Sequence, residues 1–266
     1  MNIRQTIFFI CSFIGASFFL GCKKVIDVSV KNASSQIVIN GEVNNRRGPY
    51  HIIISKSVDF SAENNFPPVS GAFVTISGNG EKDTLTESQP GIYATNSLEG
   101  KPGQSYSLFV SVEGQNFTAT SVMPQPVHLD SISFLEGRNN SIYAVANFQD
   151  PPDTANYYQF VEYSDGAPLS NGRGNFVFDD RLSDGRYIRP VLYDDSSDIK
   201  SGITLSVQMK CIDKYVYNYL YQLLQISGNG GGFSSPTPAN PSSNITGGAL
   251  GYFSANTVSS KSVKIQ

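Results

Sequence analysis

The sequence predicts an all-β protein: an immunoglobulin-like or transthyretin-like sandwich followed by a second β-rich domain with one main helix. Three observations support this prediction. Short segments alternate between apolar and polar residues, and turn residues recur at intervals of about 8–12 residues, as in β-sandwiches and barrels. Only one segment combines helical spacing of apolar residues with a helix-capping residue.

Residues 34–125 are the predicted sandwich. The stretch from "PPVSGAFVTISG" to "FTATSVMP" reads as one meander whose turns are "GNGE", "QPG" and "KPGQ". Glycine and proline at these places supply the backbone angles that tight turns need. The predicted inward residues of three strands are Ile37, Ile39, Gly41 and Val43; Tyr106, Leu108, Val110 and Val112; and Phe117, Ala119 and Met123.

Residues 126–266 are the predicted second domain, which follows the proline-flanked connector "MPQPVHLDS". Its strands include the inward rows Ile142, Ala144, Ala146 and Phe148, and Ile203, Leu205, Val207 and Met209. A helix near 213–226 begins at Asp213 as N-cap, with Ile212 and Tyr217 as a hydrophobic staple. We expect an irregular loop over 227–253 and a last strand in "VSSKSVKIQ".

The N-terminus has the order of a lipoprotein export signal. Arg4 precedes the uncharged run "IFFICSFIGASFFL", which is too short to span a bilayer and fits a signal peptide. The run ends in "FLGC", so we predict a signal peptide over 1–21, acylation of Cys22 by chains such as palmitate, and a tether over 22–33. Phe19 and Leu20 depart from the usual residues before the lipidated cysteine.

Composition narrows the class of partner. A net charge of -3 and a charged fraction of 15% do not favour nucleic acid or an anionic membrane face. Two cysteines, Cys22 and Cys211, follow the signal peptide. Because Cys22 is predicted to be acylated, we expect no disulfide within the mature chain.

Four segments resemble the bacterial lipoproteins grouped as domain of unknown function 4249. They are "CKKVIDVSV", "FPPVSGAFVTISG", "IDKYVYNYL" and "TPANPSSNITGGALGYFSA". The resemblance covers nearly the whole mature chain and implies an outer-membrane lipoprotein, often encoded near TonB-dependent receptors, with no agreed activity. The family often has acidic residues after the lipidated cysteine, where Lys23 and Lys24 stand here, so a periplasmic or surface-facing position stays open.

No catalytic or cofactor motif emerges from the residues. The sequence has no G-x-S-x-G motif that would present a serine nucleophile to His51 or His128 as a base. Cys211 has the apolar neighbours of a buried core thiol. Acidic residues at Asp179-Asp180 and at Asp194, Asp195 and Asp198 suggest either calcium ligands or solvated turns, and we favour solvated turns. We therefore predict no enzyme activity and no cofactor.

The predicted function is that of a lipid-anchored outer-membrane interaction module, accessory to a TonB-dependent receptor. The alternatives are a secreted hydrolase of glycans or peptides and a structural envelope lipoprotein. The long loop is the predicted partner-binding segment, with Phe233, Tyr252 and Phe253 as anchors. Its alternative role is to cover an open sheet edge through Pro238, Asn240 and Asn244.

Overall fold

The structure is a computed structural model that describes residues 35–58, 65–137, 141–169, 176–192, 199, 201–226 and 240–265. Residues Ser35–Gln266 form one compact unit. The predicted signal peptide 1–21, Cys22 and the rest of the tether lie outside the described residues. Within the described residues, no helix has the length and apolarity needed to cross a membrane.

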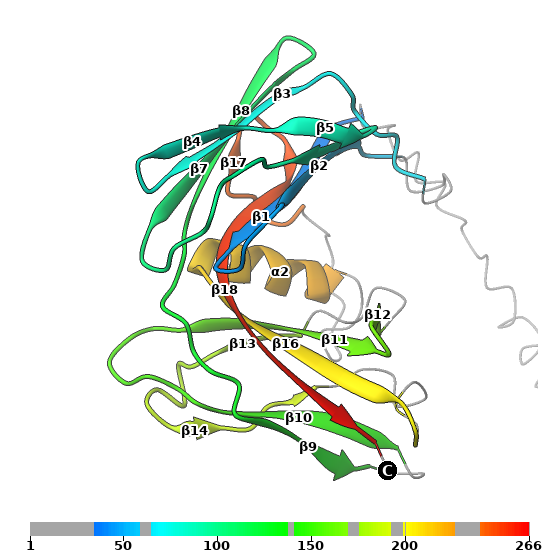
Figure 1. Cartoon of the computed structure of the whole chain (residues 1–266), viewed down its shortest axis with the longest axis vertical. Coiled ribbons are helices and arrows are strands. Elements are labelled where there is room, and N and C mark those ends of the chain that lie inside the picture. The colour runs from blue at the N-terminus through cyan, green and yellow to red at the C-terminus, as the bar shows by residue number, and fades with distance from the viewer. Residues whose placement is uncertain are drawn as a thin grey trace, which may run out of the picture. The chain divides into compact units, whose positions relative to one another are not determined.

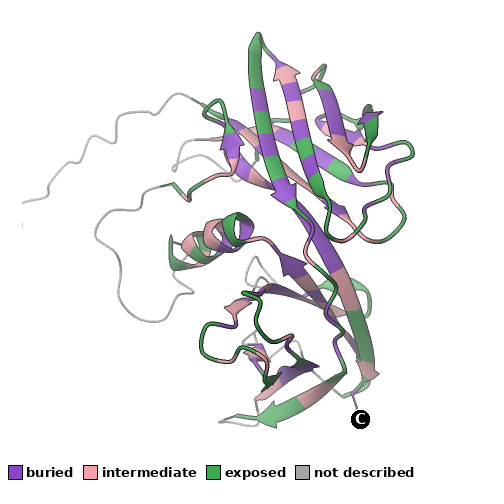
Figure 2. Ribbon diagram, turned by 90° about the vertical axis from the view of Figure 1, so that its left-hand side faces the viewer, coloured by how far each residue is buried: buried purple, intermediate pink, exposed green. Residues whose placement is uncertain are grey.

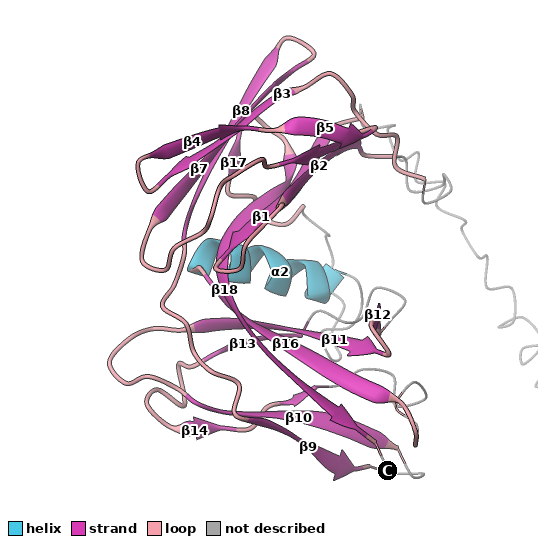
Figure 3. Cartoon of the chain, viewed as in Figure 1, coloured by secondary structure: helices cyan, strands magenta, loops and turns pink. Residues whose placement is uncertain are grey.

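Strands make up most of the described residues, so the predicted all-β class is confirmed (Figures 1 and 3). In chain order they are β1 (Ile37–Asn44), β2 (His51–Lys56), β3 (Phe73–Gly78), β4 (Glu81–Thr84), β5 (Thr86–Gln89), β6 (Ile92–Ala94), β7 (Ser105–Val112), β8 (Gln115–Val122), β9 (Ser131–Glu136), β10 (Ile142–Gln149), β11 (Tyr157–Ser164), β12 (Ala167–Pro168), β13 (Phe176–Asp179), β14 (Tyr187–Ile188), β15 (Val191–Leu192), β16 (Thr204–Ile212), β17 (Ile245–Thr246) and β18 (Leu250–Lys264).

The first core lies between two sheets. One is the five-stranded sheet β17-β8-β7-β3-β4, and the other is the β18-β1-β2-β6-β5 part of a nine-stranded sheet. Strand β7 shows why these residues form a sandwich, because its alternate side chains Tyr106, Leu108, Val110 and Val112 are all buried in this core. Gly41 of β1 has no room for a side chain, since a Cβ there would lie 2.1 Å from Cδ1 of Ile52.

The second core lies between the rest of the nine-stranded sheet and a smaller sheet. Strands β12-β11-β16-β18, with β13 beside β11, supply one side, and β14-β10-β15, with β9 beside β10, supply the other. The predicted inward row of β16 is confirmed for Leu205, Val207 and Met209, which are fully buried. The sandwich and the β-rich region with one main helix therefore both match the predicted fold class.

Strand β18 belongs to both cores. Its first half, Leu250–Asn256, pairs in parallel with β1, and its second half, Thr257–Lys264, pairs antiparallel with β16. Figure 1 shows β18 running from the first sandwich into the second region, and Figure 2 shows that its first half is the buried part. At the parallel pairing, Gly251 has a φ of 95°, and a Cβ there would lie 2.0 Å from the carbonyl oxygen of Ile39.

This course of β18 differs from the predicted loop over 227–253. The strand begins at Leu250 rather than near Val258, and β17 also lies within the predicted loop. Ile245, Ala249, Phe253 and Ala255 consequently lie in the first core, although they follow residue 126 in the chain. Parallel pairing with β1 joins segments about 200 residues apart, and no local pattern in the loop signals such a partner.

The α-helix α2 (Lys214–Ile226) forms where the sequence predicts it. Oδ1 of Asp213 accepts hydrogen bonds from the backbone N–H groups of Tyr215 and Val216, both at 2.9 Å, which confirms the N-cap. Ile212 and Tyr217 lie in one small apolar cluster with Val216 and Leu220, as a hydrophobic staple requires.

Candidate functional site

The structure places the predicted partner anchors in different environments. Phe233 lies outside the described residues. Phe253 is fully buried in the first core, so it is not available to a partner, contrary to the prediction. The physical reason is strand alternation: once this segment pairs with β1, Phe253 points inward and Tyr252 outward. The ring of Tyr252 packs against Tyr219 of α2, with centroids 5.1 Å apart.

The described part of the predicted loop covers a sheet edge. Ile245 and Thr246 of β17 pair with Ala119 and Thr118 of β8, which would be the edge of its sheet without β17. Asn244 fixes the segment by a pair of hydrogen bonds to the backbone of Phe253, from its Nδ2 to the carbonyl at 2.7 Å and from the N–H to its Oδ1 at 3.0 Å. The alternative role that the sequence suggested is therefore observed at Asn244.

An open groove of about 300 Å³ lies on the outer face of β1 and β2, beside Tyr252 of β18. We call it the junction groove. Alternation explains its character, because the core-facing residues of β1 leave Asn40, Glu42 and Asn44 on the outer face. The junction groove is lined by Asn40, Gly41, Glu42, Asn44, Pro49, Tyr50, His51, Ile53 and Tyr252.

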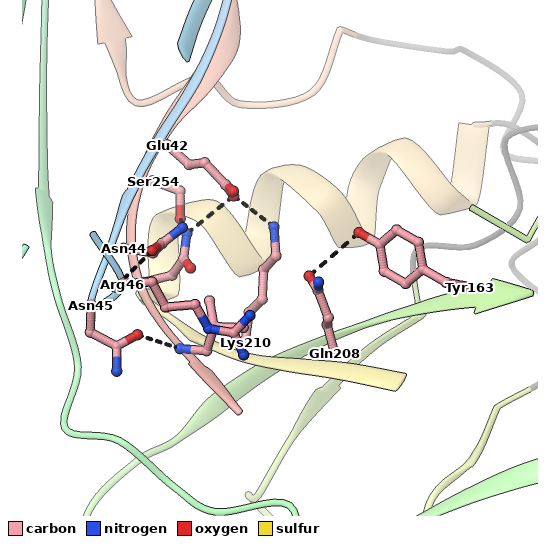
Figure 4. Close-up of polar contacts among 10 residues, drawn as sticks. Glu42, Asn44, Asn45, Arg46, Tyr163, Gln208, Lys210 and Ser254 are labelled. Carbon is pink, nitrogen blue, oxygen red and sulfur yellow. Dashed lines mark hydrogen bonds and ion pairs between the residues drawn. The ribbon is translucent and has the colours of Figure 1, made fainter. Parts of the chain in front are cut away.

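A polar network behind the groove joins β1 to β18 and β16 (Figure 4). Nζ of Lys210 lies 2.6 Å from Oε2 of Glu42, and Nδ2 of Asn256 donates to the same oxygen at 3.3 Å. The side chain of Lys210 is 12% exposed and that of Glu42 38%, so the pair is half screened by solvent. Because Lys210 lies on β16 and Glu42 on β1, this ion pair ties β1, which forms one wall of the groove, to a strand of the second region.

Contacts around the β1–β2 turn extend the network. Oδ1 of Asn45 accepts from the N–H of Val258 at 2.8 Å, and the guanidinium of Arg46 donates to Oγ of Ser260 at 2.7 Å. On the other side, the hydroxyl of Ser121 donates to Asp213 and accepts from the N–H of Ala255 at 2.8 Å. Strand β18 is thus fixed to β1 and to the start of α2.

The groove presents groups that form hydrogen bonds. Burial raises the pKa of Tyr252, and the nearby charge of Glu42 raises it further, so its hydroxyl stays neutral at physiological pH. Tyr252 lines the groove, and its neutral hydroxyl can both donate and accept a hydrogen bond. Together with Asn40 and Glu42, it offers donors and acceptors suited to a polar chain such as a peptide or a glycan.

The residues weighed for catalysis are dispersed. His51 lies in the groove, whereas His128 is exposed on the connector. Cys211 is buried in the second core, and burial raises the pKa of its thiol, which disfavours the reactive thiolate. Among the described lining residues of the groove, none is a serine or a cysteine.

The predicted acidic pair separates into two roles. Asp179 accepts hydrogen bonds from the hydroxyl of Tyr217 at 2.6 Å and from Nε of Arg181 at 2.8 Å, and so it fixes α2. Asp180 instead meets Asp150 and Asp184, which the sequence reasoning missed. The acidic turn "DDRLSDG" is the only local signal for this set, because Asp150 follows a different strand. Asp194, Asp195 and Asp198 lie outside the described residues.

Comparison with known proteins gives a family and a distant structural likeness. The family described as "Domain of unknown function (DUF4249)" matches residues 23–262. Among solved structures, a two-domain fibronectin type III segment of chicken tenascin is similar at 12% identity and a TM-score of 0.21, covering 66% of this chain and 90% of that one. No curated protein matches the chain.

Proposed function

The chain belongs to the DUF4249 family, and we propose that it is a lipid-anchored, non-enzymatic binding module of the outer membrane that assists a TonB-dependent receptor. The anchor is Cys22, whose place after a short apolar run supports acylation. Acyl chains confine the module to the membrane that holds its partner. The local concentration of the partner is therefore high, and even a weak interface can form.

The observation that carries the proposal is the junction groove. Its walls come from β1, β2 and β18, and the ion pair between Lys210 and Glu42 ties those strands to the second core. A groove held by both cores is preorganised, which reduces the entropy lost when a partner binds. The Tyr252 hydroxyl and the amide groups of the groove suit a polar segment of a receptor or of the receptor's cargo.

Recovery of the receptor tests the proposal. Tagged protein is cross-linked in cells and purified from solubilised outer membranes, and we expect a β-barrel receptor to co-purify. Tyr252→Phe removes the hydroxyl but keeps the ring packed on Tyr219, so recovery should fall while the melting temperature holds. The matched control is Tyr221→Phe on the exposed side of α2, which should leave recovery unchanged. If no barrel is recovered, the accessory role is refuted.

A hydrolase is the second candidate, because Glu42 and His51 line the same groove. An acid and an imidazole are a usual pair for general acid–base catalysis. Glu42 is engaged with Lys210 and Asn256, which favours a structural role. We expect no turnover on glycans or peptides; turnover that Glu42→Gln abolishes would establish the enzyme instead.

A further inference from the structure

Three carboxylates converge at one end of the second core. Asp150 follows β10, Asp180 follows β13, and Asp184 lies in the next turn. One oxygen from each lies within 4.8 Å of the other two. Asp150 is fully buried and Asp180 is 3% exposed, so two of the three charges are removed from water. Buried carboxylates of this kind need compensation by a cation, a proton or hydrogen bonds.

Hydrogen bonds compensate only part of this charge: the N–H of Asn156 donates to Oδ2 of Asp180 at 2.8 Å, and the N–H of Asp153 donates to Oδ2 of Asp184 at 3.3 Å. Asp150 accepts hydrogen bonds from the hydroxyl of Tyr158 and, at 3.0 Å, from the N–H of Gly185. Among the described residues, neither lysine nor arginine forms an ion pair with any of the three carboxylates.

A buried amide oxygen points to a cation independently of the carboxylates. Asn156 is nine-tenths buried, and its Oδ1 has no hydrogen-bond partner among the described residues. The N–H of Asp180 donates to the carbonyl of Asn156, which extends the antiparallel pairing of β11 and β13 by one step. Residues directly opposite in such a pair project from the same face, so the side chains of Asn156 and Asp180 share a face.

Tyr158 identifies that face. It lies two residues after Asn156 and therefore projects from the same side of β11, and its hydroxyl reaches Asp150. Strand alternation thus places Asn156 on the side of the strand that carries the carboxylates. Ser183, between Asp180 and Asp184, adds a second buried oxygen without a hydrogen-bond partner. Oxygen atoms that accept no hydrogen bond are available as ligands for a hard cation.

We propose that Asp150, Asp180, Asp184 and the side-chain oxygen of Asn156 bind a calcium ion. Calcium takes six to eight oxygen ligands in flexible geometry, and it accepts carboxylate, amide and hydroxyl oxygens together with water. Magnesium needs a near-ideal octahedron and keeps several waters, which a buried set of irregular loops suits less well. The ion links the ends of β10 and β13 to the start of β11. This site is separate from the junction groove, so it extends the proposed function.

Thermal unfolding and terbium luminescence test the site in the full chain. We expect about 5 mM CaCl₂ to raise the melting temperature by about 5 °C relative to a NaCl control of equal ionic strength, and a chelator to reverse the rise. Tb³⁺ substitutes for Ca²⁺, and Tyr158 should sensitise its emission because the tyrosine hydroxyl bonds a ligand carboxylate. Added CaCl₂ should displace the terbium signal.

Three variants decide the assignment. Asp180→Asn should abolish the calcium-induced shift, and Asp184→Asn, at an exposed position that does not threaten folding, should weaken calcium binding about tenfold or more. Asp179→Asn is the matched control, because this adjacent carboxylate bonds Tyr217 and Arg181 rather than the cluster. The proposal is overturned if CaCl₂ neither shifts the melting temperature nor displaces terbium. It is also overturned if Asp179→Asn loses the shift, or if MgCl₂ stabilises as strongly as CaCl₂.

Discussion

Replacing Phe253 by alanine separates a structural role of the last strand from a partner-binding role. The side chain is fully buried in the first core, so its removal leaves a cavity. Substitutions of this kind cost about 3–5 kcal/mol of unfolding free energy. For a chain of this size, each kcal/mol lowers the melting temperature by roughly 2–4 °C, so the expected loss is about 6–20 °C.

Urea denaturation followed by circular dichroism measures the loss directly. The control is Leu182→Ala, because this side chain is 91% exposed and its removal should change the free energy by less than about 0.5 kcal/mol. The reasoning is refuted if Phe253→Ala unfolds at the wild-type midpoint, since a side chain in the core cannot be removed without cost. A loss of receptor recovery at an unchanged midpoint would restore Phe253 as a partner anchor.

The same variant tests whether the two cores unfold together. Strand β18 pairs with β1 in the first core and with β16 in the second, so unfolding one core removes a strand from the other. Calorimetry of Phe253→Ala should therefore show a single transition at a lower temperature. Two separated transitions, with the upper one unchanged, would show that the cores are independent.

Three further predictions concern the anchor, the helix and the pH dependence. Mass spectrometry of membrane-extracted protein should find an acylated N-terminus at Cys22, and Cys22→Ser should release the protein or stall its processing; an unmodified Cys22 in the mature protein would falsify the anchor. Asp213→Ala should cost about 1–2 kcal/mol by urea denaturation, because the helix loses its N-cap, and an unchanged midpoint would contradict that role. Burial alone would raise the pKa of Asp83, but hydrogen bonds from three backbone N–H groups and from the Asn96 side chain outweigh it and lower the pKa. Its contribution is therefore complete above the unfolded pKa of about 3.9 and is lost as the pH falls through the lower folded value. Asp83→Asn should flatten this acid limb of the stability curve, and an unchanged slope would contradict the assignment.

The candidate sites depended on contacts that the sequence does not reveal. The ion pair between Glu42 and Lys210 joins residues 168 positions apart, and the bond between Glu42 and Asn256 joins residues 214 apart. The histidines and the cysteine drew attention by residue type, but the structure separates them. Asp150, in contrast, stands alone in the sequence and meets Asp180 only when β10 and β13 come together.

The sequence by itself determined the class of fold and its local elements. Period-two alternation identified the buried face of β7, and Asp213 with Ile212 and Tyr217 located the start of α2, because alternation and capping involve residues within one turn or strand. The tertiary structure decided where β18 begins and which of Tyr252 and Phe253 faces outward. Both depend on parallel pairing with β1, whose hydrogen bonds come from residues about 200 positions away. Local patterns specify a strand, but only its distant partners specify which face is buried and what the other face can bind.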